Sequence, residues 1–188
     1  MSVQEMLAAS KAAAPTLARA SNEQKNLAIT AIAELLEKAS EKVIAANDLD
    51  MKNSQNKLSA SLLDRLKLTE QRIKSLAAAV REVAQLTDPT GRILEEKTLP
   101  NGLQLQKLSV PLGVIGCIYE ARPNVTVDIA AIAIKSGNAV ALRGGSAAEN
   151  TNRVLIEVIQ AGLRQAGLPP QLVQTVDEYG REGAQQMM

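Results

Sequence analysis

Short apolar runs alternate with amphipathic segments in the second half of the chain. Three of these runs predict strands: residues 114–119, 139–142 and 172–176. The first two are continuously apolar, which is typical of strands buried on both faces of a parallel sheet. Apolar residues at helical spacing predict a helix capped by Asn124 and ended by Gly137, and another around residues 154–163, ended by Gly167. This alternation of strands and helices indicates an α/β fold with parallel strands.

The first half of the chain has helical periodicity. Ser2 and Ser21 are each followed three residues later by Glu or Gln, a capping pattern that starts two helices. Pro15 is expected to kink or split the first helix. The second is expected to continue through Val43, and the polar stretch 47–55 is expected to be a loop or a frayed helix end.

Two further helices and a hairpin complete the predicted elements. Residues 61–66 predict a short helix, and Thr69 caps a longer one that reaches about Leu86. The turn-rich linker 87–91 is the clearest boundary in the chain. Beyond it, two extended segments flank Pro100-Asn101-Gly102, a strong signal for a tight hairpin. These segments are residues 92–99 and 103–110.

Composition excludes several classes of function. The net charge is +1, and 21 basic residues balance 20 acidic ones, so no nucleic-acid partner is expected. The only aromatic residues are two tyrosines, too few for a platform on which bases stack. With no histidine and one cysteine, neither a metal site nor an internal disulfide is expected, and a reducing cytoplasm is the expected location. No run is long enough to span a membrane.

A polar loop follows the second predicted strand and consists of Arg143, Gly144, Gly145 and Ser146. Open parallel sheets bind ligands outside the carboxyl ends of their strands. The two glycines allow the backbone to approach a ligand closely, and the start of the next helix offers unpaired N–H groups. The guanidinium group of Arg143 can bind a phosphate through two hydrogen bonds, so the loop suits a phosphate group. The alternative is a tight turn that merely requires glycine. The usual G-x-G-x-x-G dinucleotide fingerprint is absent, and the residues by themselves favour neither interpretation.

An ordered series of motifs runs through this region. The motifs are P-L-G-V-I-G at 111–116, I-Y-E-A-R-P-N-V-T-V-D at 118–128, K-S-G-N-A-V at 135–140 and L-R-G-G-S at 142–146. Together with the segments 62–66, 88–91, 100–102 and 152–153, they resemble the γ-glutamyl phosphate reductase family of the aldehyde dehydrogenase superfamily. The resemblance covers essentially the whole chain. Ala147 departs from it, because many members carry Glu there.

The resemblance implies an aldehyde-dehydrogenase-like α/β fold. Residues 1–91 correspond to amino-terminal helices that pack on the nucleotide domain, 92–110 to an oligomerisation hairpin, and 111–188 to part of a parallel NADP-binding sheet. A homo-oligomer that assembles through the hairpin is therefore expected. The alternative is a hairpin that folds back on its own domain.

The resemblance also implies a reaction. Members reduce L-glutamyl 5-phosphate to L-glutamate 5-semialdehyde with NADPH and release phosphate, the second step of proline biosynthesis; association with glutamate 5-kinase is a further expectation. In the family a cysteine thiolate attacks the acyl phosphate and hydride reduces the thioester. Asn124 is similar to the residue that stabilises the oxyanion, with a helix cap as its alternative role. Arg122 is a candidate for binding an anionic group of the substrate or cofactor, and its alternative role is a surface ion pair. Arg143 is a candidate for binding the 2′-phosphate of NADPH.

The catalytic cysteine is expected to lie outside this chain. Family members are longer, and their nucleophile belongs to a catalytic domain beyond the first dinucleotide-binding segment. Cys117 lies in a predicted buried strand, where a thiol is inert. The chain is therefore predicted to be the amino-terminal portion of a reductase, either stand-alone or fused to a kinase. The alternative is a truncated, non-catalytic module for nucleotide binding or assembly.

Overall fold

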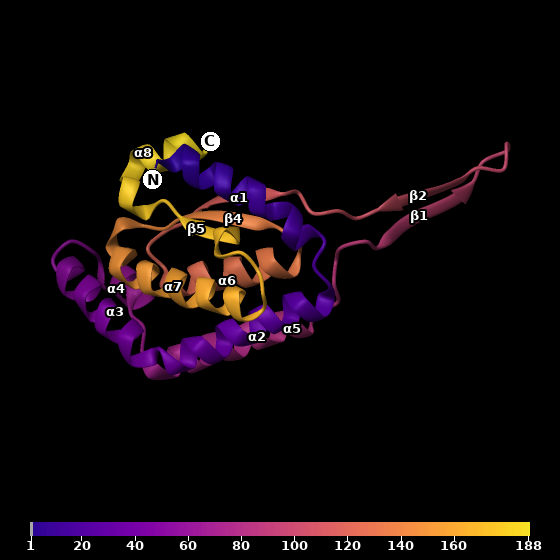
Figure 1. Ribbon diagram of the computed structural model, residues 1–188. Coiled ribbons are helices and arrows are strands. Elements are labelled where there is room, and N and C mark those ends of the chain that lie inside the picture. Colours follow the sequence, from indigo (N-terminus) through magenta and orange to yellow (C-terminus); the bar gives the residue numbers. More distant parts are fainter. Residues whose placement is uncertain (1) are drawn as a thin grey trace.

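The computed structural model describes residues 2–188 as a small sheet between layers of helices, with a projecting hairpin (Figure 1). The helices are α1 (Val3–Ala18), α2 (Asn22–Lys38), α3 (Ser40–Ser54), α4 (Ala60–Leu66), α5 (Glu70–Gln85), α6 (Pro123–Lys135), α7 (Glu149–Gln165) and α8 (Gly180–Met187). The strands are β1 (Ile93–Thr98), β2 (Gln104–Leu108), β3 (Val114–Ile118), β4 (Ala139–Arg143) and β5 (Val173–Thr175). Short 3-10 turns lie at Ser146–Ala148, Pro170–Leu172 and Asp177–Tyr179.

The sheet has the order β3-β4-β5, and all three strands are parallel. The predicted strands and their parallel arrangement are therefore confirmed. The central strand β4 is buried, but alternate residues of β3 are exposed, and Ile118 is 50% exposed. The expected burial of residues 114–119 on both faces is thus wrong, because the exposed residues Gly116 and Ile118 point to the same face of β3, which the helices cover incompletely.

Local capping signals placed the starts of the amino-terminal helices correctly. The Ser2 and Ser21 hydroxyls accept hydrogen bonds from the backbone N–H groups three residues later, and Thr69 does the same at the start of α5. Pro15 does not split α1, which continues to Ala18. Because Pro15 lies in the last turn, the helix loses one backbone hydrogen bond with only three residues still to come.

The stretch 47–55 differs from its prediction. The long predicted helix breaks at Ala39 into α2 and α3, and α3 continues through the polar stretch to Ser54. Three of its polar residues, Asn47, Asp50 and Ser54, face inward, and Asn47 is completely buried. The Asn47 amide donates to Leu66 O (2.9 Å) and accepts from Leu68 N (2.7 Å), so it fastens the chain that follows α4. A polar residue is stable in this core because both ends of its amide are hydrogen-bonded.

Helices cover both faces of the sheet. Figure 1 shows α1 on one face and α6 and α7 on the other, with α2 and α5 as a further layer beneath α6 and α7. The crossing of α2 and α7 is especially close. A Cβ atom added to Gly162 of α7 would lie 2.5 Å from Ile32 Cγ1 and 2.9 Å from Ile32 N. Glycine at this position therefore allows the two helix backbones to approach each other.

The hairpin projects away from the body, and every residue of β1 and β2 is exposed (Figure 1). The alternative in which it folds back on its own domain is therefore wrong for this chain. Its base is anchored by Lys25, a fully buried lysine of α2. The ammonium group lies 2.5 Å from Asp88 Oδ2 and donates to Thr90 Oγ1 (3.0 Å). This ion pair fastens the linker 87–91 to the helical body.

Candidate functional site

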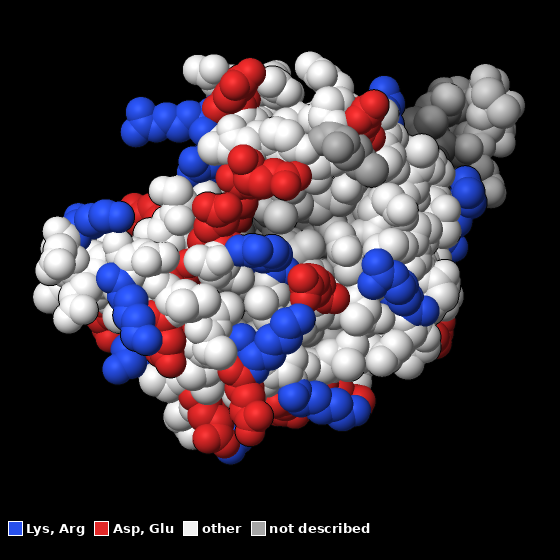
Figure 2. Space-filling model, turned by 60° about the vertical axis from the view of Figure 1, so that its left-hand side comes forward, with Lys and Arg blue, Asp and Glu red and all other residues white. Residues whose placement is uncertain are grey.

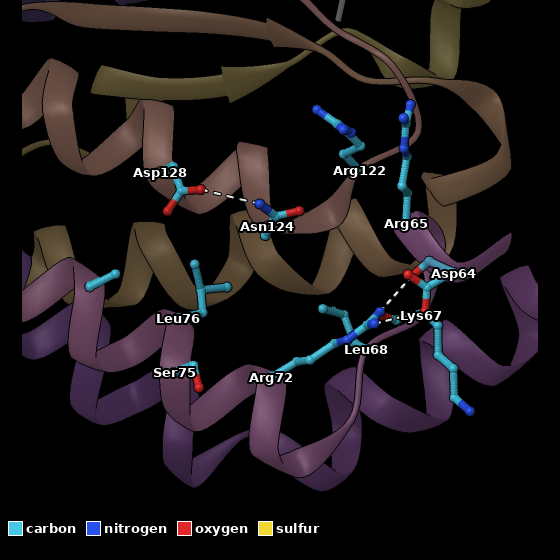
Figure 3. Close-up of a pocket in the computed structure, with 11 residues that line it drawn as sticks. Asp64, Arg65, Lys67, Leu68, Arg72, Ser75, Leu76, Arg122, Asn124 and Asp128 are labelled. Carbon is cyan, nitrogen blue, oxygen red and sulfur yellow. Dashed lines mark hydrogen bonds and ion pairs between the residues drawn. The ribbon is translucent and has the colours of Figure 1, made fainter. Parts of the chain in front are cut away.

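Two pockets share lining residues: one lies where the connection from α4 to α5 and α5 itself face the start of α6 (Figure 3), and the other lies between α4 and the loops that follow β3 and β4. The larger, of about 520 Å³, is lined by Asp64, Arg65, Lys67, Leu68, Arg72, Ser75, Leu76, Ala79, Arg122, Asn124 and Asp128. The smaller, of about 330 Å³, is lined by Leu58, Leu62, Arg65, Glu120, Ala121, Arg122, Gly145, Ser146 and Ala147. Arg65 and Arg122 belong to both. The fold thus brings Arg122 and Asn124 into one pocket, and Gly145 and Ser146 into the next.

The two shared arginines have a weak internal partner. Glu120 Oε2 lies 3.6 Å from Arg65 Nη1 and 3.9 Å from Arg122 Nε, and all three side chains are more than 40% exposed. Ion pairs this long and this exposed contribute little free energy. Arg122 therefore has the surface ion pair that was its alternative role, but the pairing leaves both guanidinium groups able to bind an anion.

Arg72 shapes the floor of the larger pocket. Its guanidinium donates to Asp64 Oδ1 and to the carbonyl of Lys67, each at 2.8 Å, and also to the carbonyl of Asp64 (Figure 3). These bonds hold the turn from α4 to α5 and leave Arg72 committed to its own segment. Sequence reasoning missed this role, because the acceptors are mostly backbone carbonyls.

Asn124 is the second residue of α6 and not its cap. Arg122 occupies the cap position and Pro123 the first turn, where a missing N–H costs nothing. The predicted capping role of Asn124 is therefore wrong. Its side-chain Nδ2 instead donates to Asp128 Oδ2 one turn later, at 3.3 Å. Burial raises the pKa of the Asp128 carboxyl above its usual value, although the bond from Asn124 opposes this shift.

The loop after β4 has internal partners for the N–H groups that the sequence suggested for phosphate. The Gly144 N–H donates to Asp177 Oδ1 at 2.7 Å. In the first turn of α7, the backbone N–H groups of Asn150 and Thr151 donate to the carboxylate of Asp50, at 3.3 and 2.8 Å. The helix start is thus occupied by a carboxylate of the protein itself.

Close packing explains both glycines of this loop. A Cβ atom on Gly144 would lie 2.3 Å from Asn152 Nδ2, and one on Gly145 would lie 2.5 Å from Ala121 N. The tight-turn interpretation therefore accounts for the glycines, while Gly145 and Ser146 still line the smaller pocket. The Arg143 side chain lies apart from them, and its Nε donates to the carbonyl of Gly180 at 3.4 Å.

A chain of side-chain hydrogen bonds ties the carboxyl ends of the strands to the helices. It runs from the Tyr119 hydroxyl to Thr126 Oγ1 (2.7 Å), from Thr126 to Asn152 Oδ1 (2.8 Å), and from Asn152 Nδ2 to Asp177 Oδ2 (2.9 Å). Burial raises the pKa of Tyr119, which stays protonated. The sequence offered no local signal for this network, because its members lie on four different segments.

Cys117 lies in β3 and lines neither of the two pockets. Its side chain is partly buried and packs against the core, and burial raises the pKa of its thiol. Because the thiolate is the nucleophilic form, this environment disfavours catalysis by Cys117.

The surface carries no dominant charge on the face shown in Figure 2, where Lys and Arg are interspersed with Asp and Glu. This distribution matches the balanced composition. Within residues 2–188, no helix has the length and apolarity needed to cross a membrane.

Comparisons with known proteins extend the interpretation of the site. The model of the aldehyde dehydrogenase family matches residues 1–188. The chain belongs to the aldehyde dehydrogenase family. Among curated relatives, it is 52% identical over 188 residues to a γ-glutamyl phosphate reductase of Leifsonia xyli, covering 100% of this chain and 45% of the relative. It is 49% identical over 176 residues to a γ-glutamyl phosphate reductase of a Geobacillus strain, covering 93% of this chain and 43% of the relative. This aldehyde dehydrogenase chain therefore spans less than half the length of these relatives.

Solved structures agree with the family assignment. The γ-glutamyl phosphate reductase of Thermotoga maritima superimposes with a TM-score of 0.95 at 34% identity, covering 98% of this chain and 45% of that one. The γ-glutamyl phosphate reductase of Saccharomyces cerevisiae superimposes with a TM-score of 0.88 at 31% identity, covering 94% of this chain and 46% of that one. An acetylating aldehyde dehydrogenase of Geobacillus thermoglucosidasius shares the fold at 15% identity with a TM-score of 0.71, covering 93% of this chain and 36% of that one. The predicted fold and the resemblance to γ-glutamyl phosphate reductase are confirmed.

Proposed function

We propose that this chain is the part of a γ-glutamyl phosphate reductase that binds the acyl phosphate and contributes to cofactor binding. The reaction is the NADPH-dependent reduction of L-glutamyl 5-phosphate to L-glutamate 5-semialdehyde, with release of phosphate, in proline biosynthesis. One observation carries the proposal: Arg65, Arg122 and Asn124 line one pocket in a chain 52% identical to a protein of that name.

The pocket residues have distinct roles in this proposal. Arg122 and Arg65 bind anionic groups of the substrate, because their shared partner Glu120 lies at 3.6 Å or beyond. Asn124 donates from its side-chain amide to the oxygen of the reacting carbonyl, where negative charge develops. The second N–H of that amide is held by Asp128, which orients the donor.

The residues at the carboxyl edge of the sheet fit a dinucleotide in part. A nicotinamide dinucleotide supplies the hydride when it is bound. Ser146 and Gly145 line a pocket at this edge, and Arg143 provides a positive charge for the 2′-phosphate of NADPH. Gly144 contributes space for Asn152 and Tyr119. The start of α7 is not proposed as a phosphate site, because Asp50 accepts from its N–H groups.

The remaining parts of the reaction are proposed to lie elsewhere. Cys117 is not the nucleophile, since burial raises its pKa and it lines neither pocket. The nucleophilic cysteine is proposed to belong to the part of the relatives that this chain does not span. The exposed hairpin is proposed to mediate homo-oligomerisation, and glutamate 5-kinase, which makes the labile substrate, is proposed as a partner.

The test is an assay of the complete protein for NADPH oxidation and phosphate release with L-glutamyl 5-phosphate. Replacement of Arg122 by Ala is expected to lower kcat/KM about 10- to 100-fold, the loss typical of a charge-assisted hydrogen bond. The matched control is Arg164→Ala, an exposed arginine of α7. A complete protein that binds NADPH but oxidises none with this substrate would contradict the proposal and favour a non-catalytic binding module.

A further inference from the structure

Asp128 has a half-buried carboxylate on the wall of the larger pocket. Within residues 2–188, no Lys or Arg lies within ion-pair distance of it, and its side chain accepts a hydrogen bond from the neutral amide of Asn124. By contrast, Asp64 in the same pocket is paired with Arg72 at 2.8 Å. A carboxylate that is removed from water without a cation is costly, as its raised pKa shows. The pocket wall therefore has an unmatched negative charge.

The position of Asp128 relates it to the reacting end of the substrate. Figure 3 shows Asp128 and Asn124 on the same side of α6, with Arg122 at the start of the helix and Arg65 beside Arg122. Residues four apart on a helix are separated by about 6 Å along its axis. In a γ-glutamyl group the amino nitrogen is four bonds from the reacting carbonyl carbon, a reach of about 5 Å. A substrate whose carbonyl lies at Asn124 thus has its amino group within reach of Asp128.

We propose that Asp128 binds the free α-ammonium group of the substrate and makes the pocket selective for an α-amino acid derivative. This inference rests on the proposed function and names the feature of the substrate that the pocket recognises. The ammonium group supplies the cation that Asp128 lacks, while Arg122 and Arg65 pair with the anionic groups of the same molecule. The pocket then matches a substrate that carries charges of both signs.

The test compares two substrates in the complete enzyme, assayed in the oxidative direction with phosphate and NADP⁺. One is L-glutamate 5-semialdehyde, and the other is 5-oxopentanoate, which lacks only the amino group. Replacement of Asp128 by Asn keeps an oxygen that accepts from the Asn124 amide but removes the charge. Asp128→Asn is expected to lower kcat/KM about 10- to 100-fold for the amino substrate and to leave that for 5-oxopentanoate within twofold. Asp48→Asn, at an exposed position on α3, is the charge control.

The other outcomes would overturn the inference. Equal losses on both substrates would show that Asp128 acts only by orienting Asn124, and no loss on either would show that it binds nothing in the reaction. A wild-type enzyme that uses both substrates equally well would exclude selection of the amino group. A wild-type enzyme that turns over neither substrate would instead refute the proposed function, and the inference with it.

Discussion

Single carboxylates of this protein occupy positions where a ligand was expected. Asp50 accepts four hydrogen bonds at the start of α7: from the backbone and side-chain amides of Asn150 (3.3 and 2.8 Å) and from the backbone and hydroxyl of Thr151 (2.8 and 2.6 Å). A carboxylate at a helix start also interacts favourably with the helix dipole. Asp50 therefore caps α7 from a different helix.

Replacement of Asp50 by Ala is expected to lower the free energy of unfolding by about 2 to 3 kcal/mol, because it removes a cap and leaves buried donors unsatisfied. Urea titration of the chain followed by circular dichroism measures the change. Asp48→Ala, on the exposed side of the same helix, is expected to change stability by less than about 0.5 kcal/mol. Equal effects of the two substitutions would show that the Asp50 cap is not stabilising.

Arg143 is the residue proposed to distinguish the two nicotinamide cofactors. Its side-chain Nε donates a long hydrogen bond, 3.4 Å, to the carbonyl of Gly180, so a phosphate competes with a weak partner. Arg143→Ala in the complete enzyme is expected to raise KM for NADPH about tenfold or more and to leave KM for NADH nearly unchanged. Steady-state kinetics with each cofactor measure this difference, with Arg164→Ala as control. Equal losses for both cofactors would refute the role.

At the scale of elements, the close crossing of α2 and α7 depends on Gly162. Alanine is the better helix former by about 1 kcal/mol, so Gly162→Ala would stabilise an isolated α7. In the folded chain the added methyl group overlaps with Ile32, and separating the helices loses contacts along both of them. Gly162→Ala is expected to destabilise the chain by about 1 to 3 kcal/mol in urea titrations.

The control for Gly162 is Gln165→Ala, an exposed position on the same helix, which is expected to be nearly neutral. If Gly162→Ala raised the midpoint of unfolding, helix propensity would outweigh the packing of α2 on α7, and the close crossing would not be a constraint.

At the scale of the whole molecule, the hairpin is the part without intramolecular support beyond its base. It exposes a set of large apolar side chains: Ile93 (54%), Leu94 (58%), Leu103 (62%), Leu105 (49%) and Leu108 (48%). A lone two-stranded ribbon is marginally stable in water, and exposed apolar patches mark interaction surfaces. Both properties support assembly through the hairpin.

The complete protein is expected to sediment as a homo-oligomer, and the double substitution Leu103→Lys with Leu105→Lys is expected to shift it to the monomer. The oligomer is expected to dissociate because the two substitutions place positive charges in an apolar contact between subunits. Sedimentation velocity measures the state, and circular dichroism checks that the helices persist. Gln104→Lys adds charge next to both sites without removing an apolar side chain and serves as the control. A wild-type protein that stays monomeric across micromolar concentrations would contradict the prediction.

Much of the fold was predictable because its signals are local. The caps at Ser2, Ser21 and Thr69 lie within three residues of the groups they bind. The alternation of apolar strands and amphipathic helices specified the parallel sheet, and Asn101-Gly102 specified the hairpin turn. The motifs around Arg122 and Arg143 indicated the family, since they are long and ordered.

Only the tertiary structure decided which residues meet. The sequence by itself predicted elements and family, but its local signals carry no information about partners a hundred residues away. Asp50 looked like part of a loop, although its acceptors face donors 100 and 101 positions later on α7. Arg65 of α4 and Arg122 at the start of α6 line one pocket together with residues of α5, and no local signal in the sequence relates these three segments. Contacts between distant segments therefore decided which partner each of these charged residues has, because the local sequence around them did not specify one.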